Sequence, residues 1–229
     1  MNPAISPEEP GSSTDPPRRS REWRARLVIA ALTALGTLGP YFLASIVTGW
    51  HKFRLPLYLA LELEVPFVPV FSLGYVSLYV LLGVAFFAFP SRREMLPLAT
   101  TLVFQSLVAA VFFLLVPVEY AFQHPAPTGF PGIVFRFADT VNLEHNMCPS
   151  LHVAMAWTTS AAIAARCGMI GRIGLFGWSL VITASTVLIH QHYFGDVLAG
   201  GLLAFISSRY FLPWLSSGKR TLRFPFAAR

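Results

Sequence analysis

Two short polar segments beside long apolar runs carry the residues whose types and spacing could do chemistry. One holds His192 and Asp196, four positions apart, and the other holds Pro149, Ser150 and His152. A four-residue spacing on a helix puts two side chains on one face, one turn apart. The carboxylate can then accept a hydrogen bond from one imidazole nitrogen and leave the other nitrogen free to attack. The pattern predicts that His192 is a nucleophile oriented by Asp196.

His152 would complete such a site from a second helix. Pro149 is typical of a first helical turn, where its missing N–H costs nothing, so His152 is expected in that turn. His192 is expected at or just before the start of another helix. Helix N-termini carry unpaired N–H groups and a partial positive charge, and they therefore favour an anion. If the two ends meet, His152 can protonate a leaving oxygen, and the predicted chemistry is phosphoryl transfer.

A zinc site is an alternative interpretation of the same region. His190, His192, His152 and Asp196 are all of ligand type. A His-x-His pair at a helix start rarely directs both rings to one ion unless the backbone is extended there, which disfavours zinc. Three other histidines are interpreted as interfacial polar residues: His51, His124 and His145.

The composition is that of an all-α integral membrane protein. Of the 229 residues, 55% are hydrophobic and 12% are charged, and the charged share is about half that of a soluble domain. The mean hydropathy is +0.59, and a water-soluble fold of this size could not bury so much apolar surface. The net charge of +6 does not indicate nucleic acid, because the cations lie at the ends of apolar runs. A disulfide between Cys148 and Cys167 is not expected, because the intervening helix separates them by about 28 Å.

Hydropathy predicts a six-transmembrane-helix bundle over residues 27–213. A disordered basic tail at 1–26 precedes it, and a basic cytoplasmic tail at 214–229 follows. The predicted spans are 27–47, 66–89, 96–116, 149–165, 173–189 and 193–212. The polar connection at 119–148 is predicted to be a loop with a short helix near 133–138. Three glycines are expected to serve close helix packing: Gly195, Gly200 and Gly201.

The distribution of charge predicts an orientation. Alternating six spans from a cytoplasmic N-terminus puts fourteen of the 17 lysines and arginines on the cytoplasmic side and three on the other, as the positive-inside rule requires. All six histidines then fall on the non-cytoplasmic side. We expect both termini in the cytoplasm and the site on the periplasmic or luminal side. A bacterial inner membrane is the expected location, and an ER or Golgi membrane fits the same charges.

The two polar segments resemble the second and third motifs of the type 2 phosphatidic acid phosphatase superfamily. Pro-Ser-Leu-His at 149–152 is similar to the family's P-S-G-H, and Ser185, His192 and Asp196 match the spacing of its S-R-x5-H-x3-D. Leucine at position 151 is typical of the branch that includes inositol phosphorylceramide synthase, an inositolphosphotransferase. The proline- and tyrosine-containing run at 65–79 resembles the same branch.

The resemblance implies a six-helix bundle with its site at the non-cytoplasmic ends and with no metal or other cofactor. It implies that His192 forms a phosphohistidine, that Asp196 orients it, and that His152 protonates the leaving group. Two departures remove expected phosphate-binding cations: the K-x6-R-P first motif is absent, and Thr186 replaces the arginine of the third motif. Candidate substrate-binding residues are Arg136, Asn146, Ser150, Ser185 and His190, with Lys52 and Arg54 as further cations.

The expected function is a membrane enzyme that cleaves a lipid phosphoester or phosphodiester through a phosphohistidine. Water would resolve the intermediate in a phosphatase, and an alcohol would resolve it in a headgroup phosphotransferase, which the branch resemblance favours. The expected partners are a lipid phosphate, an alcohol acceptor lipid and the membrane, without nucleic acid. The absent cations motivate a second hypothesis, a non-catalytic lipid-binding or transport protein that retains the fold.

Overall fold

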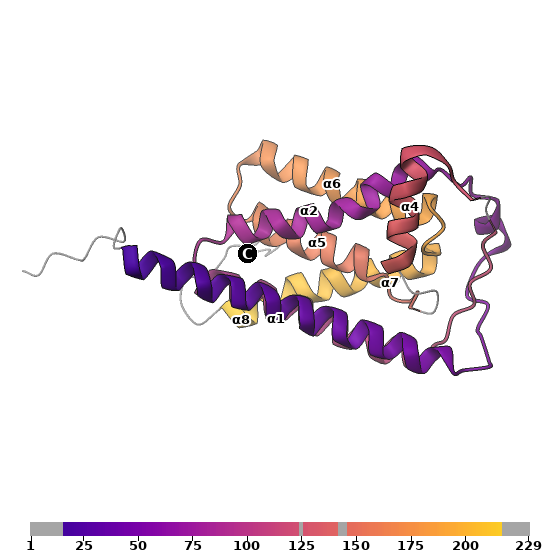
Figure 1. Ribbon diagram of the computed structural model, residues 1–229, viewed down its shortest axis with the longest axis horizontal. Helices are drawn as coiled ribbons and strands as arrows, with labels where there is room; N and C mark the ends of the chain where they lie inside the picture. The colour runs from indigo at the N-terminus through magenta and orange to yellow at the C-terminus, as the bar shows by residue number, and fades with distance from the viewer. Residues whose placement is uncertain (1–15, 124–125, 142–145, 217–229) are drawn as a thin grey trace, which may run out of the picture.

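The computed structural model describes residues 16–123, 126–141 and 146–216. Over these ranges the chain is mostly helical and contains no β-strand, only one bridge between Leu55 and Val118. The long helices run side by side in an elongated bundle, and α4 crosses them near one end (Figure 1). The prediction of an all-α protein is confirmed.

Five helical segments are long and apolar enough to cross a membrane. They contain between 20 and 30 residues, and a span needs about 20 apolar residues. The elements are α1 (Pro16–Gly49), α2 (Ser72–Ala88) with the short η2 (Pro69–Phe71) before it, α3 (Arg92–Leu115), α6 (Met169–Leu188), and α7 (Phe194–Ile206) continued by the π-helical η3 (Ser207–Phe211) and by α8 (Leu212–Ser216). By length and composition, the chain is a membrane protein.

The predicted fourth span, 149–165, is a shorter helix inside the bundle. It is α5 (Leu151–Ala164), whose 14 residues reach about 21 Å. All of its side chains except His152 and Trp157 are buried, and the helix packs against α2, α3, α6 and α7. This run is apolar because protein surrounds it, and it is shorter than an ordinary span. The predicted count of six spans is therefore not confirmed for the described residues.

The first helix begins earlier than predicted. We expected a disordered tail as far as residue 26, whereas α1 begins at Pro16, and proline is tolerated in a first helical turn. Arg26 is only 8% exposed. Its guanidinium donates a hydrogen bond to the Phe86 carbonyl and stacks over the rings of Phe86 and Trp23. These contacts tie this part of α1 to α2 and explain why it is ordered.

The charged residues between the second and third predicted spans form the first turn of α3. The Ser91 hydroxyl accepts a hydrogen bond from the Glu94 N–H at 3.4 Å and donates one to the Glu94 carboxylate at 2.9 Å. This Ser-x-x-Glu pattern caps a helix N-terminus. Glu94 also pairs with Arg166 at 2.5 Å, so the start of α3 is joined to the end of α5.

The polar connection after α3 contains α4 (Gly129–Val141). The predicted short helix is confirmed and is longer than expected. Phe135 and Ala138 are buried in a small cluster with Tyr75 and Ile189, so α4 packs with one apolar face over the end of the bundle. The connection before α2 contains a 3₁₀ helix, η1 (Ala60–Glu64). The predicted basic tail at 214–229 is described only as far as residue 216, which ends α8.

Candidate functional site

The starts of α5 and α7 lie against each other. The Ser150 N–H donates to the Asp196 carbonyl oxygen over 3.0 Å. Gly200 allows this approach, because a Cβ at that position would lie 2.4 Å from the Ser150 carbonyl oxygen. The packing role predicted for Gly200 is confirmed. Within the described residues, a Cβ at Gly195 or Gly201 would meet no atom within 4 Å, so the packing role predicted for these two glycines is not confirmed. The two polar segments of the sequence thus meet in space.

The predicted nucleophile and its orienting carboxylate are adjacent and buried. His192 Nδ1 lies 3.6 Å from Asp196 Oδ2, and both side chains are 2% exposed. This distance is within ion-pair range but exceeds a hydrogen bond. The same oxygen accepts the Tyr193 N–H at 2.9 Å, and the Cys148 thiol also hydrogen-bonds to Asp196. Nε2 is the His192 nitrogen that does not face the carboxylate.

A tight turn between α6 and α7 positions His192. The N–H groups of Gln191 and His192 both donate to the Thr186 carbonyl oxygen, at 2.9 and 3.1 Å. His190 adopts a positive φ of 57°, which is uncommon for a residue with a side chain. The Thr186 hydroxyl donates to the Thr183 carbonyl at 2.8 Å within its own helix. Thr186 therefore shapes the turn through its backbone, at the position where the resembled motif has a phosphate-binding arginine.

His152 lies in the first turn of α5, as predicted. Its ring stacks on Tyr75 with centroids 3.8 Å apart and meets the edge of Tyr79. His152 and His192 are close enough to interact electrostatically. The Nε2 atom of His152 is buried and has no hydrogen-bond partner among the residues that the structure describes. A buried nitrogen without a partner is costly, and it can be satisfied by a ligand.

Asn146 and Ser150 hold the segment before α5. The Asn146 amide donates to the Tyr41 carbonyl at 2.7 Å, which connects this segment to α1. Its Oδ1 atom is buried, and no described residue hydrogen-bonds to it. The Ser150 hydroxyl caps α5 by accepting the Val153 N–H at 3.4 Å. Both residues lie beside His152 along the chain, but Ser150 is used for structure and only Asn146 keeps an unpaired polar atom.

Three predicted substrate-binding residues are used elsewhere. Ser185 donates to the Val181 carbonyl at 2.6 Å and packs against Gly74, at the contact between α6 and α2. His190 Nε2 is 2.8 Å from the Val65 carbonyl oxygen, and its ring stacks on Phe122. Ser185 thus lies at a contact between two helices, and His190 lies in the turn between α6 and α7.

Arg136 is the third of these residues. It is exposed on α4, where its guanidinium donates to the Pro127 carbonyl at 3.1 Å. No described contact joins it to the histidines. His124 and His145, which were interpreted as interfacial, lie outside the described residues.

Glu62 is a residue of this region that the sequence analysis missed. It is 3% exposed although it lies in an irregular connection. One carboxylate oxygen accepts the Leu59 N–H at 2.5 Å, and the other accepts the N–H of Phe194, the first residue of α7. A carboxylate at a helix N-terminus is favourable because of the partial positive charge there. The signal in the sequence was an acidic residue that interrupts an apolar run between two leucines.

Cys148 is the second missed residue. Burial raises the pKa of the Cys148 thiol to about 12, and the charge of Asp196 and the hydrogen bond to it act in the same direction. The thiol therefore stays protonated at neutral pH and donates to the carboxylate. A thiol of this kind is not a nucleophile. It acts on the carboxylate that faces His192.

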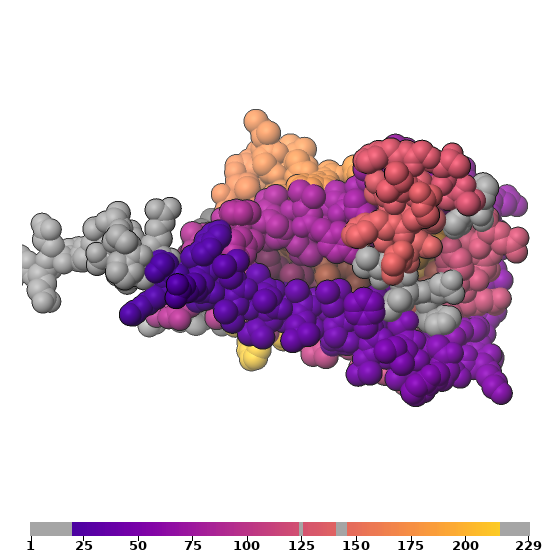
Figure 2. Space-filling view, in the orientation of Figure 1, coloured from indigo at the N-terminus to yellow at the C-terminus, as the bar shows by residue number. Residues whose placement is uncertain are grey.

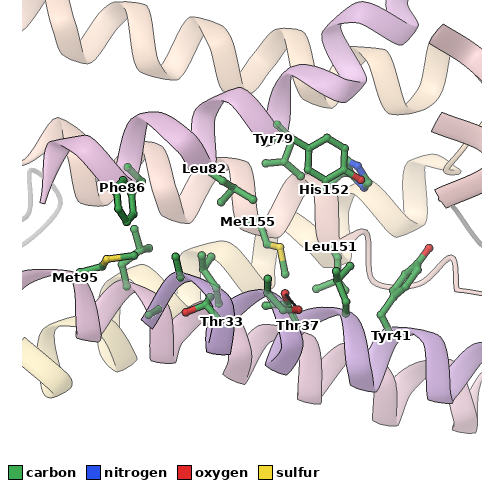
Figure 3. Close-up of a pocket in the computed structure, with 18 of the residues that line it drawn as sticks. Thr33, Thr37, Tyr41, Tyr79, Leu82, Phe86, Met95, Leu151, His152 and Met155 are labelled. Atoms are coloured by element: carbon green, nitrogen blue, oxygen red, sulfur yellow. Dashed lines mark hydrogen bonds between the residues drawn. The ribbon is translucent and has the colours of Figure 1, made fainter. Parts of the chain in front are cut away.

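An apolar groove reaches the site from one side. It has a volume of about 280 Å³ and is walled by α1, α2, α3 and α5, with His152 among its lining residues (Figure 3). Over the described ranges, no group of three or more His, Cys, Asp or Glu side chains is arranged to hold a metal ion. The site is thus a buried pair of His192 and Asp196 with the half-buried His152 beside it, in a chain that carries five candidate membrane spans. No family model, curated protein or solved structure matches this chain.

Proposed function

We propose that this protein is a membrane enzyme that transfers a phosphoryl group or a phosphodiester headgroup of a lipid through a phosphohistidine on His192. The observation that carries the proposal is the buried pair of His192 and Asp196, 3.6 Å apart, with His152 within electrostatic reach. Burying ionisable side chains is costly without a partner or a function. The resemblance to the type 2 phosphatidic acid phosphatase motifs supports the same chemistry.

The proposed reaction begins with attack by His192 Nε2 on phosphorus. A bond forms between this nitrogen and phosphorus, and the bond from phosphorus to the leaving oxygen breaks. Asp196 faces Nδ1 and stabilises the positive charge that develops on the ring. A protonated His152 gives its proton to the leaving oxygen. In the second step, neutral His152 removes a proton from water or an alcohol, whose oxygen attacks phosphorus and releases His192.

A cation for the phosphate is best supplied by Arg54. Its Nη1 atom is buried and has no hydrogen-bond partner within the described parts of the chain. The next residue, Leu55, donates to the Pro117 carbonyl at 2.8 Å, and the adjoining Val118 packs in one cluster with Tyr193. The segment that carries Arg54 is therefore attached to the end of the bundle where His192 lies. The N-terminus of α7 is a poorer phosphate site, because Glu62 already accepts a hydrogen bond from Phe194.

Trapping of the intermediate tests the proposal. Purified protein in detergent is mixed with phosphatidic acid labelled in its phosphate and quenched in alkaline detergent, since phosphohistidine is labile in acid. Label is expected on the peptide containing His192 in the wild type and in His51→Ala, and it is expected to be lost in His192→Ala. A parallel reaction with a labelled phosphodiester lipid decides between monoester and diester substrates. Wild-type turnover equal to that of His192→Ala would contradict the proposed nucleophile.

A non-catalytic lipid-binding protein is the second candidate. The observations that favour it are the Glu62 carboxylate at the start of α7 and the uncharged Thr186. Both lower the capacity of the site for phosphate. This candidate predicts binding of a lipid phosphate without label on any histidine.

We further propose that the site faces the periplasm or an organelle lumen, with both chain termini in the cytoplasm, an arrangement in which α5 carries the chain across the membrane together with the five candidate spans. The bias of lysine and arginine between the two sides supports this orientation. A membrane-impermeant alkylating reagent applied to intact cells, with single cysteines placed at position 51 or position 93, tests it: the first should react and the second should not.

A further inference from the structure

The groove beside His152 lies between two helices that are held apart. α1 packs along α3, whereas α2 packs on α5, α6 and α4. The space between α1 and α2 forms a furrow on the molecular surface (Figure 2). Its floor is formed by α3 and α5, with Leu98 and Met155 among the lining residues. Because the walls belong to candidate membrane spans, this furrow would open toward lipid.

The walls of the groove offer almost no hydrogen-bonding capacity. Away from the end that carries Tyr41, Tyr79 and His152, the lining residues offer two hydroxyls, those of Thr33 and Thr37 on α1. Thr33 donates to the Ile29 carbonyl at 2.7 Å, and Thr37 donates to the Ala34 carbonyl at 3.0 Å. Both hydroxyls are thus used within their own helix. A long apolar slot without free donors suits a hydrocarbon chain.

The two ends of the groove differ in chemistry. Tyr41, Tyr79 and His152 lie at one end, and Phe86 and Met95 lie at the other (Figure 3). The first end carries the unpaired Nε2 of His152, so it is the end where a polar headgroup finds a partner. The wall on α1 extends from Ala30 to Tyr41, which is about 16 Å along the helix axis.

At the far end, side chains of α1 contact Phe86 of α2. The Arg26 guanidinium lies 4.5 Å from the centre of the Phe86 ring and donates to the Phe86 carbonyl. The Trp23 ring meets the same phenyl ring edge to face, with centroids 5.2 Å apart. Phe86 is thereby fixed from two sides, and a chain that enters from the His152 end meets it as a stop.

We propose that the groove between α1 and α2 binds one hydrocarbon chain of a lipid phosphate, with the phosphate at His152, and that Phe86 sets the preferred chain length. The volume of about 280 Å³ lies at the small end of ligand sites and fits a single chain. This inference rests on the proposed function, because it takes the occupant to be the substrate. It adds that the substrate is selected by the length of one chain.

Photocrosslinking locates the chain independently of turnover. The full-length protein in detergent is irradiated with hexadecyl phosphate that carries a diazirine near the end of its chain. Label is expected on the peptides containing Phe86 and Met95, both in the wild type and in His192→Ala. Unlabelled hexadecyl phosphate should displace the probe at least about tenfold better than hexadecanol does, since the charged headgroup binds at the site. Label confined to other helices, or equal displacement by the alcohol, would overturn the proposal.

Matched variants block the groove without touching the site. Ala34 lines the groove, whereas the adjacent Leu35 does not line it and is 69% exposed. Ala34→Phe is expected to reduce labelling about tenfold, and Leu35→Phe should leave it unchanged. Labelling that persists undiminished in Ala34→Phe would contradict occupancy of this groove.

The preferred length of the hydrocarbon chain tests whether Phe86 limits how far a chain can enter the groove. Binding of alkyl phosphates from octyl to eicosyl is measured by displacement of the probe. Phe86→Ala should shift the optimum to longer chains, by about tenfold in relative affinity for two further buried methylenes. Phe87 is the matched control, because it is 72% exposed and does not line the groove. If a folded Phe86→Ala protein prefers the same chain length as the wild type, Phe86 does not set the chain length.

The two proposals fail in different ways. If no phosphohistidine forms but the chain is labelled at Phe86, the proposed reaction is wrong and the groove assignment stands. If His192 is phosphorylated but the label lies elsewhere, the reaction stands and the groove assignment is wrong.

Discussion

The starts of α5 and α7 are two helix N-termini in contact, and different groups accept hydrogen bonds from their first N–H groups. At α7, the N–H groups of Tyr193 and Phe194 are accepted by the carboxylates of Asp196 and Glu62. At α5, a single hydroxyl from Ser150 accepts one N–H at the long distance of 3.4 Å. Each helix start has the same partial positive charge, but at α7 the protein itself supplies the anions.

This difference separates the roles of the two histidines. His192 lies just before the start of α7, where carboxylates already neutralise the partial positive charge. Its own carboxylate partner, Asp196, is fixed by several contacts. His152 lies at the start of α5, where no carboxylate among the described residues accepts the helix N–H groups. It is next to a groove that reaches the surface, and its Nε2 atom has no described hydrogen-bond partner. A phosphate is therefore expected to approach from the α5 side. The predictions below test this asymmetry.

The largest effect is expected from the histidines themselves. His192→Ala should lower turnover of a lipid phosphate by about 10³-fold or more, because the covalent route is lost. His152→Ala should lower it by about 10²- to 10⁴-fold. The two variants differ with p-nitrophenyl phosphate, whose leaving group needs no proton: the burst of p-nitrophenolate that reports the first step should be restored in His152→Ala and absent in His192→Ala. Equal rescue of both would show that the roles are not divided in this way.

The next effect comes from the contact between the two helices. Gly200→Ala should lower turnover by about 100-fold, because a Cβ 2.4 Å from the Ser150 carbonyl oxygen forces the ends apart. Gly201→Ala is the control, since a Cβ there meets nothing within 4 Å. Both proteins are compared by initial rates and by melting temperature in detergent. Similar rates for the two variants would mean that the close approach is not needed for activity.

A smaller effect is expected when the anion at α7 is removed. Glu62→Ala leaves the Phe194 N–H without its carboxylate acceptor, which should lower the free energy of unfolding by roughly 2 kcal/mol. Added orthovanadate should then raise the melting temperature more in this variant than in the wild type, because an anion can occupy the vacated helix end. Glu64, exposed on the same short helix η1, provides the control Glu64→Ala. Melting temperatures that match the wild type would remove the proposed distinction between the two helix starts.

Some of this architecture could be predicted from the sequence, and some could not. The pairing of His192 with Asp196 follows from helical spacing, which is a local property. Hydropathy cannot distinguish a run that crosses a bilayer from one buried by protein, so α5 was expected to be a full span. The partners of Glu62 and Ser185 lie far away in the chain, at Phe194 and Gly74. Their roles depend on packing between helices, on which spacing within one segment carries no information.

The smallest effect is expected at Cys148, which acts on the carboxylate of the α7 end from the loop that leads into α5. Its thiol hydrogen-bonds to Asp196, and its pKa of about 12 keeps it protonated. Cys148→Ala should lower turnover only a few-fold, and Cys148→Ser should retain more activity because a hydroxyl can also donate. The raised pKa favours the folded state while the thiol is protonated, so this contribution is present below pH about 9 and is lost as the pH rises toward about 12.

Alkylation of this thiol measures the same contact. In a Cys167→Ser background, iodoacetamide should label Cys148 slowly at pH 8, where about one thiol in 10⁴ is ionised. The rate should keep rising about tenfold per pH unit well beyond the ordinary thiol range. Asp196→Asn removes the nearby charge and should speed labelling, whereas Glu119→Gln, a more distant change, should not. A rate that levels off near pH 9 would show that the thiol is not held by the carboxylate, and the two helix starts would then share no contact through Cys148.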